Sequence, residues 1–141
     1  RGRGKLVGIA SVSGIRGLPG SEAYGASKSA VITYNESLRV GLRKTGIKVQ
    51  TISPGFVRTP LTSANPYKMP FVLTPDEFAE RAVKTIDSDA SYRTIPWQMG
   101  LLAKAMRIAP NCLWDKIVAN RKQKPRLADK QKAEAEAAQR K

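Results

Sequence analysis

The 141-residue sequence contains no histidine and only one cysteine, Cys112. Catalytic schemes that need an imidazole are therefore excluded. A structural zinc site draws its ligands mainly from several Cys and His side chains, so we expect no metal site. A lone cysteine cannot form an internal disulfide, which is compatible with a reducing compartment and favours a cytoplasmic location.

Long apolar runs are also missing. No stretch of the sequence has the roughly 18 consecutive apolar residues that a membrane-spanning helix needs. No segment resembles the apolar core of a signal peptide either. With 141 residues, the chain is long enough to form one domain with a hydrophobic core.

Acidic residues are few: 11 Asp and Glu stand against 25 Lys and Arg, a formal net charge of +14. Such a charge raises nucleic acid or an anionic membrane surface as possible partners. Much of the excess lies near the two ends, at Arg1, Arg3 and Lys5 and within 121–141, and terminal charge runs are usually solvated tails. We therefore expect no nucleic-acid partner, and a basic surface would suit an anionic dinucleotide equally well.

The hydrophobic pattern predicts an α/β chain in which strands and helices alternate. Short apolar runs predict strands, and these lie at 5–10, 47–53 and 92–97. Between the first two, apolar residues at spacings of three and four predict a helix over 22–44, which we expect Ser21 to cap and Gly46 to end. A strand, a helix and a strand in this order imply a parallel crossover.

The second half of the chain contains a proline-rich segment and more helices. Residues 59–73 carry three prolines and no clear period, which predicts a loop that could cover a pocket. The run Thr-Pro-Asp-Glu at Thr74–Glu77 is a capping pattern that predicts the start of a helix. From 98 onward the pattern is helical and amphipathic, in two pieces broken at Pro110.

These elements divide the chain into a main domain at 1–97, an amphipathic helical extension at 98–124 and a charged, low-complexity tail at 125–141. Two interpretations of the extension are open. Its helices form a hairpin packed on their own domain, or they present an apolar surface with basic flanks to a membrane surface or a partner. We expect the first, so membrane contact is possible but not favoured.

The stretch Tyr24–Lys28 carries the candidate chemistry. Tyr24 and Lys28 are four residues apart, so on a helix they share one face, about 6 Å apart along the axis. A cation there would stabilise the phenolate and lower a phenol pKa that is ordinarily about 10, which makes a general acid or base. The alternative is an exposed pair without function. Ser11, thirteen residues before Tyr24, follows a predicted strand at the edge where α/β sheets bind ligands.

From Lys5 to Thr62 these features occur in a fixed order. An apolar strand ends in serine, and a Gly-rich turn follows. Tyr-x-x-x-Lys then opens a long helix, and a second apolar strand leads into Pro-Gly-x-x-x-Thr. This order resembles the catalytic half of the short-chain dehydrogenase/reductase family. The resemblance implies the C-terminal half of a Rossmann-type doubly wound parallel sheet, followed here by the amphipathic helices.

The resemblance also implies an activity, the interconversion of an alcohol and a carbonyl by hydride transfer with NAD or NADP. Tyr24 would be the acid/base. Lys28 would lower the pKa of Tyr24 and hold the nicotinamide ribose hydroxyls, and Ser11 would bind the substrate oxygen, with Ser13 as an alternative hydroxyl. Tyr24 and Lys28 would also bind the cofactor, and the remaining cofactor-binding positions that match the family are Pro54, Gly55, Val57 and Thr59.

The sequence departs from the family's pattern in what it lacks: a Gly-rich strand-to-helix turn, an acidic residue after a second strand, and an asparagine upstream of the serine. The resemblance extends over about 5–97, so we expect a fragment that is inactive alone and a homo-oligomer at full length. The expected partner is a small-molecule alcohol or carbonyl. The alternative is a non-catalytic interaction or membrane-surface module that keeps the fold.

Overall fold

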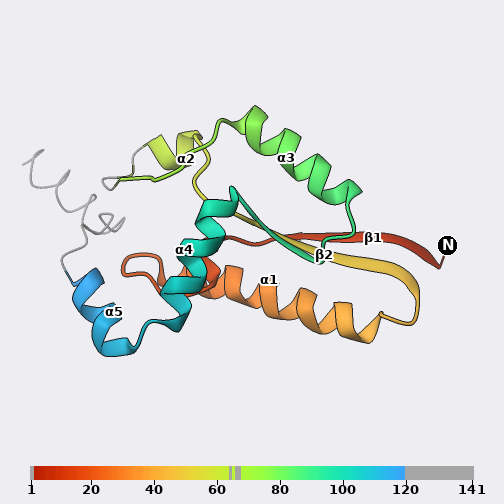
Figure 1. The fold of residues 1–141 in the computed structure, drawn as a ribbon, viewed down its shortest axis with the longest axis horizontal. Coiled ribbons are helices and arrows are strands. Elements are labelled where there is room, and N and C mark those ends of the chain that lie inside the picture. Colours follow the sequence, from red (N-terminus) through yellow and green to blue (C-terminus); the bar gives the residue numbers. More distant parts are fainter. Residues whose placement is uncertain (1, 64, 66–67, 120–141) are drawn as a thin grey trace, which may run out of the picture.

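The computed structural model describes residues 2–63, 65 and 68–119 (Figure 1). The predicted tail at 125–141 lies outside these residues. In chain order the elements are β1 (Arg3–Ile9), the 3-10 turn η1 (Val12–Gly14), α1 (Glu22–Gly41), β2 (Gly46–Pro54), α2 (Pro60–Ser63), α3 (Pro75–Asp87), β3 (Tyr92–Ile95), α4 (Trp97–Ile108) and α5 (Asn111–Val118).

Within the described residues, the three strands form one parallel sheet in the order β1-β2-β3. The register places Leu6 opposite Val49 and Thr51 opposite Tyr92. Helices cover both faces: α1 lies along one and α3 along the other, and α4 packs on β3 (Figure 1). This is the predicted α/β architecture, a Rossmann-type parallel sheet followed by C-terminal helices.

The main apolar core lies between the sheet and α3. Ile52, Leu73, Ala82 and Ile95 are buried there. The start of α3 has the predicted capping box: Thr74 Oγ1 accepts a hydrogen bond from Glu77 N at 3.2 Å, and a Glu77 carboxylate oxygen accepts one from Thr74 N at 2.8 Å. Two donors at the helix N-terminus are thereby satisfied, which fixes where the helix begins.

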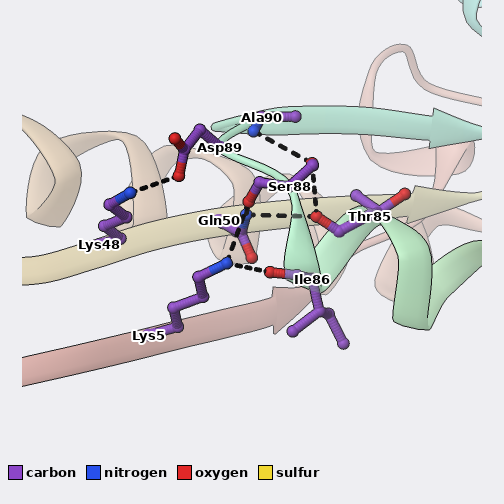
Figure 2. Close-up of polar contacts among 8 residues, drawn as sticks. All are labelled: Lys5, Lys48, Gln50, Thr85, Ile86, Ser88, Asp89 and Ala90. Carbon is purple, nitrogen blue, oxygen red and sulfur yellow. Dashed lines mark hydrogen bonds and ion pairs between the residues drawn. The ribbon is translucent and has the colours of Figure 1, made fainter.

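Polar side chains from the sheet hold the other end of α3 (Figure 2). Gln50, which is only 2% exposed, donates through Nε2 to main-chain carbonyls at the end of this helix, and so does Lys5 through Nζ. An ion pair between Lys48 and Asp89 lies beside them. The accepting carbonyls belong to Thr85, Ile86 and Ser88. Donors and a cation at a helix C-terminus satisfy its unpaired carbonyls and oppose its dipole.

The ends and the buried face of α1 differ from the prediction. The helix ends at Gly41, and Gly46 opens β2 instead of following the helix, so that prediction was wrong. Ser21 sits at the N-cap but makes no side-chain capping bond. The buried residues of α1 are Gly25, which lies against Ser13 of η1, and Asn35, whose Nδ2 donates to Thr51 Oγ1 of β2 at 3.2 Å. A buried hydrogen bond to the sheet, which apolar spacing does not reveal, therefore helps to fix which side of the helix faces β2.

The predicted loop at 59–73 contains the short helix α2. The two predicted C-terminal helices are present and separate at Pro110. No helix in the described part of the chain combines the length and the hydropathy that crossing a bilayer requires.

Candidate active site

Ser11 lies immediately beyond the carboxyl end of β1. The main chain is held there by β2, because Ala10 N donates to Ile52 O at 2.8 Å. Ser11 is buried and caps η1, its hydroxyl oxygen accepting a hydrogen bond from Ser13 N at 3.2 Å. The Ser11 side chain therefore has a fixed place at the edge where parallel sheets bind ligands.

Tyr24 and Lys28 lie on the first turns of α1, where the sequence predicted them. The Lys28 ammonium nitrogen is 5.8 Å from the centre of the Tyr24 ring, within the range of a cation–π contact. The same nitrogen donates to Ile9 O at 3.1 Å. Lys28 thus joins the helix to the end of β1, and Tyr24, 48% exposed, keeps its ring open to solvent.

Gly14 allows η1 to lie directly against α1. A Cβ atom at this position would come within 2.7 Å of the Lys28 carbonyl carbon and the Ser29 nitrogen. These are main-chain atoms of a helix and have little room to move. The absence of a side chain at Gly14 therefore lets the Ser11 turn approach the part of α1 that carries Tyr24 and Lys28.

A cavity of about 280 Å³ opens between the Ser11 turn, α1 and the segment after β2. It brings together Ser11, Tyr24 and Gly55, three of the predicted site residues. Ser13, the alternative hydroxyl, also lines it. The rest of the lining is formed by Val12, Gly20, Ser21, Phe56, Thr62 and Asn65.

The other predicted residues, Lys28, Pro54, Val57 and Thr59, do not line the cavity. Pro54 ends β2, and the following Gly55 N donates to Ile95 O at 2.8 Å. Val57 pairs with Leu73 in an isolated parallel bridge, which carries the segment across the end of the sheet. Lys28 lies next to a lining residue, with its ammonium nitrogen 5.8 Å from the centre of the Tyr24 ring.

Thr62 is a site residue that sequence reasoning missed. Its hydroxyl oxygen accepts a hydrogen bond from Thr59 N at 2.9 Å and lies 2.8 Å from Val57 O, to which it can donate. Thr62 thus organises the turn that contains two predicted cofactor positions. Thr62 accepts from the main-chain nitrogen of the residue that precedes α2, as the second half of a capping box does, so the spacing Thr59-x-x-Thr62 was a partial signal. No local pattern pointed to Phe56 or Asn65.

The lining residues limit what the site can do chemically. Hydroxyl groups line the cavity, and the ammonium of Lys28 lies near the ring of the lining residue Tyr24. None of the cavity-lining residues is acidic. In residues 2–63, 65 and 68–119, no three Cys, Asp or Glu side chains are placed together to hold a metal ion. The arrangement can donate hydrogen bonds to a polar oxygen and transfer a proton from a phenol.

Comparison with known proteins identifies the family. A family model described as short chain dehydrogenase matches residues 1–69. An uncharacterized oxidoreductase of Myxococcus xanthus is 43% identical over 115 residues, which cover 82% of this chain and 46% of that protein. The chain belongs to the short-chain dehydrogenase family. It spans about half the length of this curated relative.

Solved structures agree on the fold. A short chain dehydrogenase from Burkholderia cenocepacia in complex with NADP superposes with a TM-score of 0.69 at 17% identity, over 82% of this chain and 48% of that one. An actinorhodin polyketide ketoreductase solved with NADPH gives a TM-score of 0.58 at 26% identity, over 71% of this chain and 48% of that one. Both neighbours were crystallised with a nicotinamide cofactor.

Proposed function

We propose that the protein is an NAD- or NADP-dependent oxidoreductase that interconverts an alcohol and a carbonyl. The observation that carries the proposal is that Ser11 and Tyr24 line the same cavity, although they are thirteen residues apart in the sequence. The Lys28 ammonium lies over the Tyr24 ring. Family membership supports the same chemistry.

In the reducing direction, Tyr24 gives its proton to the carbonyl oxygen of the substrate. Ser11, or Ser13 beside it, donates a hydrogen bond to the same oxygen and stabilises the charge that develops there. The Lys28 ammonium stabilises negative charge on Tyr24 as the proton leaves. In oxidation the same groups act in reverse, with Tyr24 accepting the proton of the alcohol.

The residues present fit the nicotinamide end of a cofactor. An ammonium has three donor hydrogens, and Lys28 uses one of them on Ile9 O, which leaves donors for ribose hydroxyls. Pro54 ends β2 and Gly55, Val57 and Thr59 follow it, at the edge where open α/β sheets bind nucleotides. The bound nicotinamide would supply or accept the hydride. The neighbours solved with NADP and NADPH support this choice.

The cavity walls favour a small organic substrate. Val12 and Phe56 supply apolar surface, and the hydroxyls cluster around Ser11 and Tyr24. A pocket with apolar walls and a few convergent polar groups is typical of a small-molecule site. We therefore infer a small alcohol or carbonyl compound as the substrate.

A second candidate function is a non-catalytic module that binds through its C-terminal helices. The observation in its favour is the exposure of large apolar side chains on α4 and α5, including Trp97, Ile108 and Ile117. Lys104, Arg107 and Lys116 provide positive charge on the same helices. A surface of this kind suits an anionic membrane interface.

Substitution of Tyr24 in the intact protein separates the two functions. Tyr24→Phe removes the transferable proton and keeps the ring, so turnover of a ketone with NADPH should fall by about two to four orders of magnitude. Tyr34→Phe is the matched control, since Tyr34 is 64% exposed on the same helix. Binding of NADPH should be unchanged in Tyr34→Phe and little changed in Tyr24→Phe, which keeps the ring and Lys28. Near-normal turnover by Tyr24→Phe would exclude Tyr24 as the acid/base.

A further inference from the structure

Arg16 makes an unusual set of contacts for a loop residue. Its Nη1 donates to the main-chain carbonyls of Met106, at 2.7 Å, and Ala109. Its Nη2 donates to Asn111 Oδ1 at 3.0 Å. The guanidinium carbon lies 5.0 Å from the centre of the Trp114 ring. One side chain thus reaches the end of α4, the start of α5 and an aromatic ring on α5.

Side chains of the C-terminal helices also donate hydrogen bonds to the loop that contains Arg16. Trp114 Nε1 donates to Gly17 O at 3.2 Å, and Arg107 Nη1 donates to Ile15 O at 3.4 Å. Three consecutive loop residues, 15–17, are therefore bonded to α4 and α5. We call these contacts, centred on Arg16, the Arg16 clamp.

Physical reasons favour arginine at this position. The last carbonyls of α4 have no partner within the helix, and they carry the negative end of its dipole. A guanidinium supplies five donor hydrogens in a planar fork and can stack on an aromatic face at the same time. Lysine at this position would keep the positive charge but lose the fork and the stacking.

The clamp holds the loop that forms one wall of the catalytic cavity. Residues 11–21 connect Ser11 to the helix of Tyr24, and Ser13, Gly20 and Ser21 line the cavity on either side of the clamped residues. A displacement at Arg16 is therefore transmitted to both flanks of the wall. The family model ends at residue 69, so α4 and α5 lie beyond the matched part of the chain.

We propose that Arg16 is a positioning residue that makes α4 and α5 a structural part of the active site. Through the clamp, the two helices set the position of the cavity wall between Ser11 and Tyr24. The catalytic consequence of this inference rests on the proposed function. The mechanical consequence, a loop held by the C-terminal helices, does not.

The test compares Arg16→Ala, Arg16→Lys and Arg43→Ala in the intact protein. Arg43 is an exposed arginine just beyond α1 and serves as the control. Hydrogen–deuterium exchange should rise in 11–21 and 106–114 for Arg16→Ala, rise less for Arg16→Lys, and stay unchanged in α3. With NADPH and the activated ketone ethyl 4-chloroacetoacetate, kcat should fall on the order of tenfold to a hundredfold in Arg16→Ala. The Kd for NADPH should not change.

Exchange at 11–21 that matches the parent would overturn the inference. Faster exchange at 11–21 with an unchanged kcat would also overturn it, because the clamp would then serve stability alone. If Arg16→Ala fails to fold, Asn111→Ala and Trp114→Phe remove single contacts and should give smaller changes of the same kind. A parent protein that reduces no ketone would refute the proposed function, and the exchange data would still decide whether the clamp holds the loop.

Discussion

Gly14→Ala is the substitution with the most specific expected effect on the candidate site. The added methyl group would stand 2.7 Å from the Lys28 carbonyl carbon and the Ser29 nitrogen and 2.9 Å from Lys28 O. Carbon atoms in proteins pack at about 3.5–4.0 Å, so η1 and α1 must separate by roughly 1 Å. The two elements that move apart carry Ser11 and Tyr24.

The size of the effect follows from this overlap. Forcing one extra methyl group into a packed contact costs about 1–3 kcal/mol. For domains of about 150–250 residues, that corresponds to a fall in Tm of roughly 2–12 °C. A misplacement of about 1 Å between reacting groups costs on the order of a hundredfold in turnover. Activity should therefore fall much further than the loss of stability alone would explain.

Calorimetry and turnover measurements on the same samples test this prediction, with Gly41→Ala as the control. Gly41 is the last residue of α1, away from the cavity lining, and a Cβ atom there meets nothing within 4 Å. The control should keep its Tm and its turnover. If Gly14→Ala had the Tm and kcat of the control, the close approach between η1 and α1 could not be what positions Ser11.

Three further predictions concern Lys28, Glu77 and Trp114. Lys28→Ala should lower turnover and weaken NADPH binding together, because one ammonium serves both roles; loss of only one would separate the roles. Hydrogen bonds from the Thr74 main chain and side chain hold the pKa of Glu77 below its ordinary value of 4.5. The contribution of these hydrogen bonds to the free energy of unfolding is present above pH 4.5 and declines as the pH falls below that value. Urea titrations from pH 6 to 3 should therefore show that Glu77→Gln loses this part of the decrease in stability with falling pH. Trp114→Ala should lower Tm, because it breaks the stacking on Arg16, whereas Trp97→Ala, at a position 65% exposed, should barely change it. Strong, salt-sensitive binding of the folded protein to anionic vesicles would favour the surface interpretation of α4 and α5.

The features that sequence could predict are those with local causes. The capping box at Thr74 was readable because its partners are three residues apart. The convergence of Ser11 and Tyr24 was readable for a different reason: parallel strands place their carboxyl ends at one edge, and the Tyr-x-x-x-Lys pattern opens the following helix.

The features that sequence could not predict depend on contacts between distant segments. Asn35 sits on the buried face of α1 because Thr51 on β2 accepts its hydrogen bond. Arg16 carries no local pattern, and its partners lie about 90 residues further along the chain. Gly46 resembled the end of a helix but starts a strand, because pairing with β1 extends β2 to that residue.

The position of the C-terminal helices depended on such distant contacts as well. Their existence and the break at Pro110 followed from spacing and from proline chemistry. Where they pack does not follow from their own residues. α4 packs on β3, and the loop at 15–17 holds the end of α4 and α5. Trp114 is half-buried against this loop, whereas Leu113 and Ile117 stay exposed.

Transfer of deuterium from the cofactor to the product is the most direct test of the central proposal. The intact protein would be incubated with NADPH deuterated at the reactive nicotinamide carbon and a prochiral ketone, and the alcohol analysed by mass spectrometry. The account predicts one deuterium on the carbinol carbon with the parent and almost no alcohol with Tyr24→Phe. An unlabelled alcohol, or equal labelled product from the parent and from Tyr24→Phe, would contradict hydride transfer assisted by Tyr24.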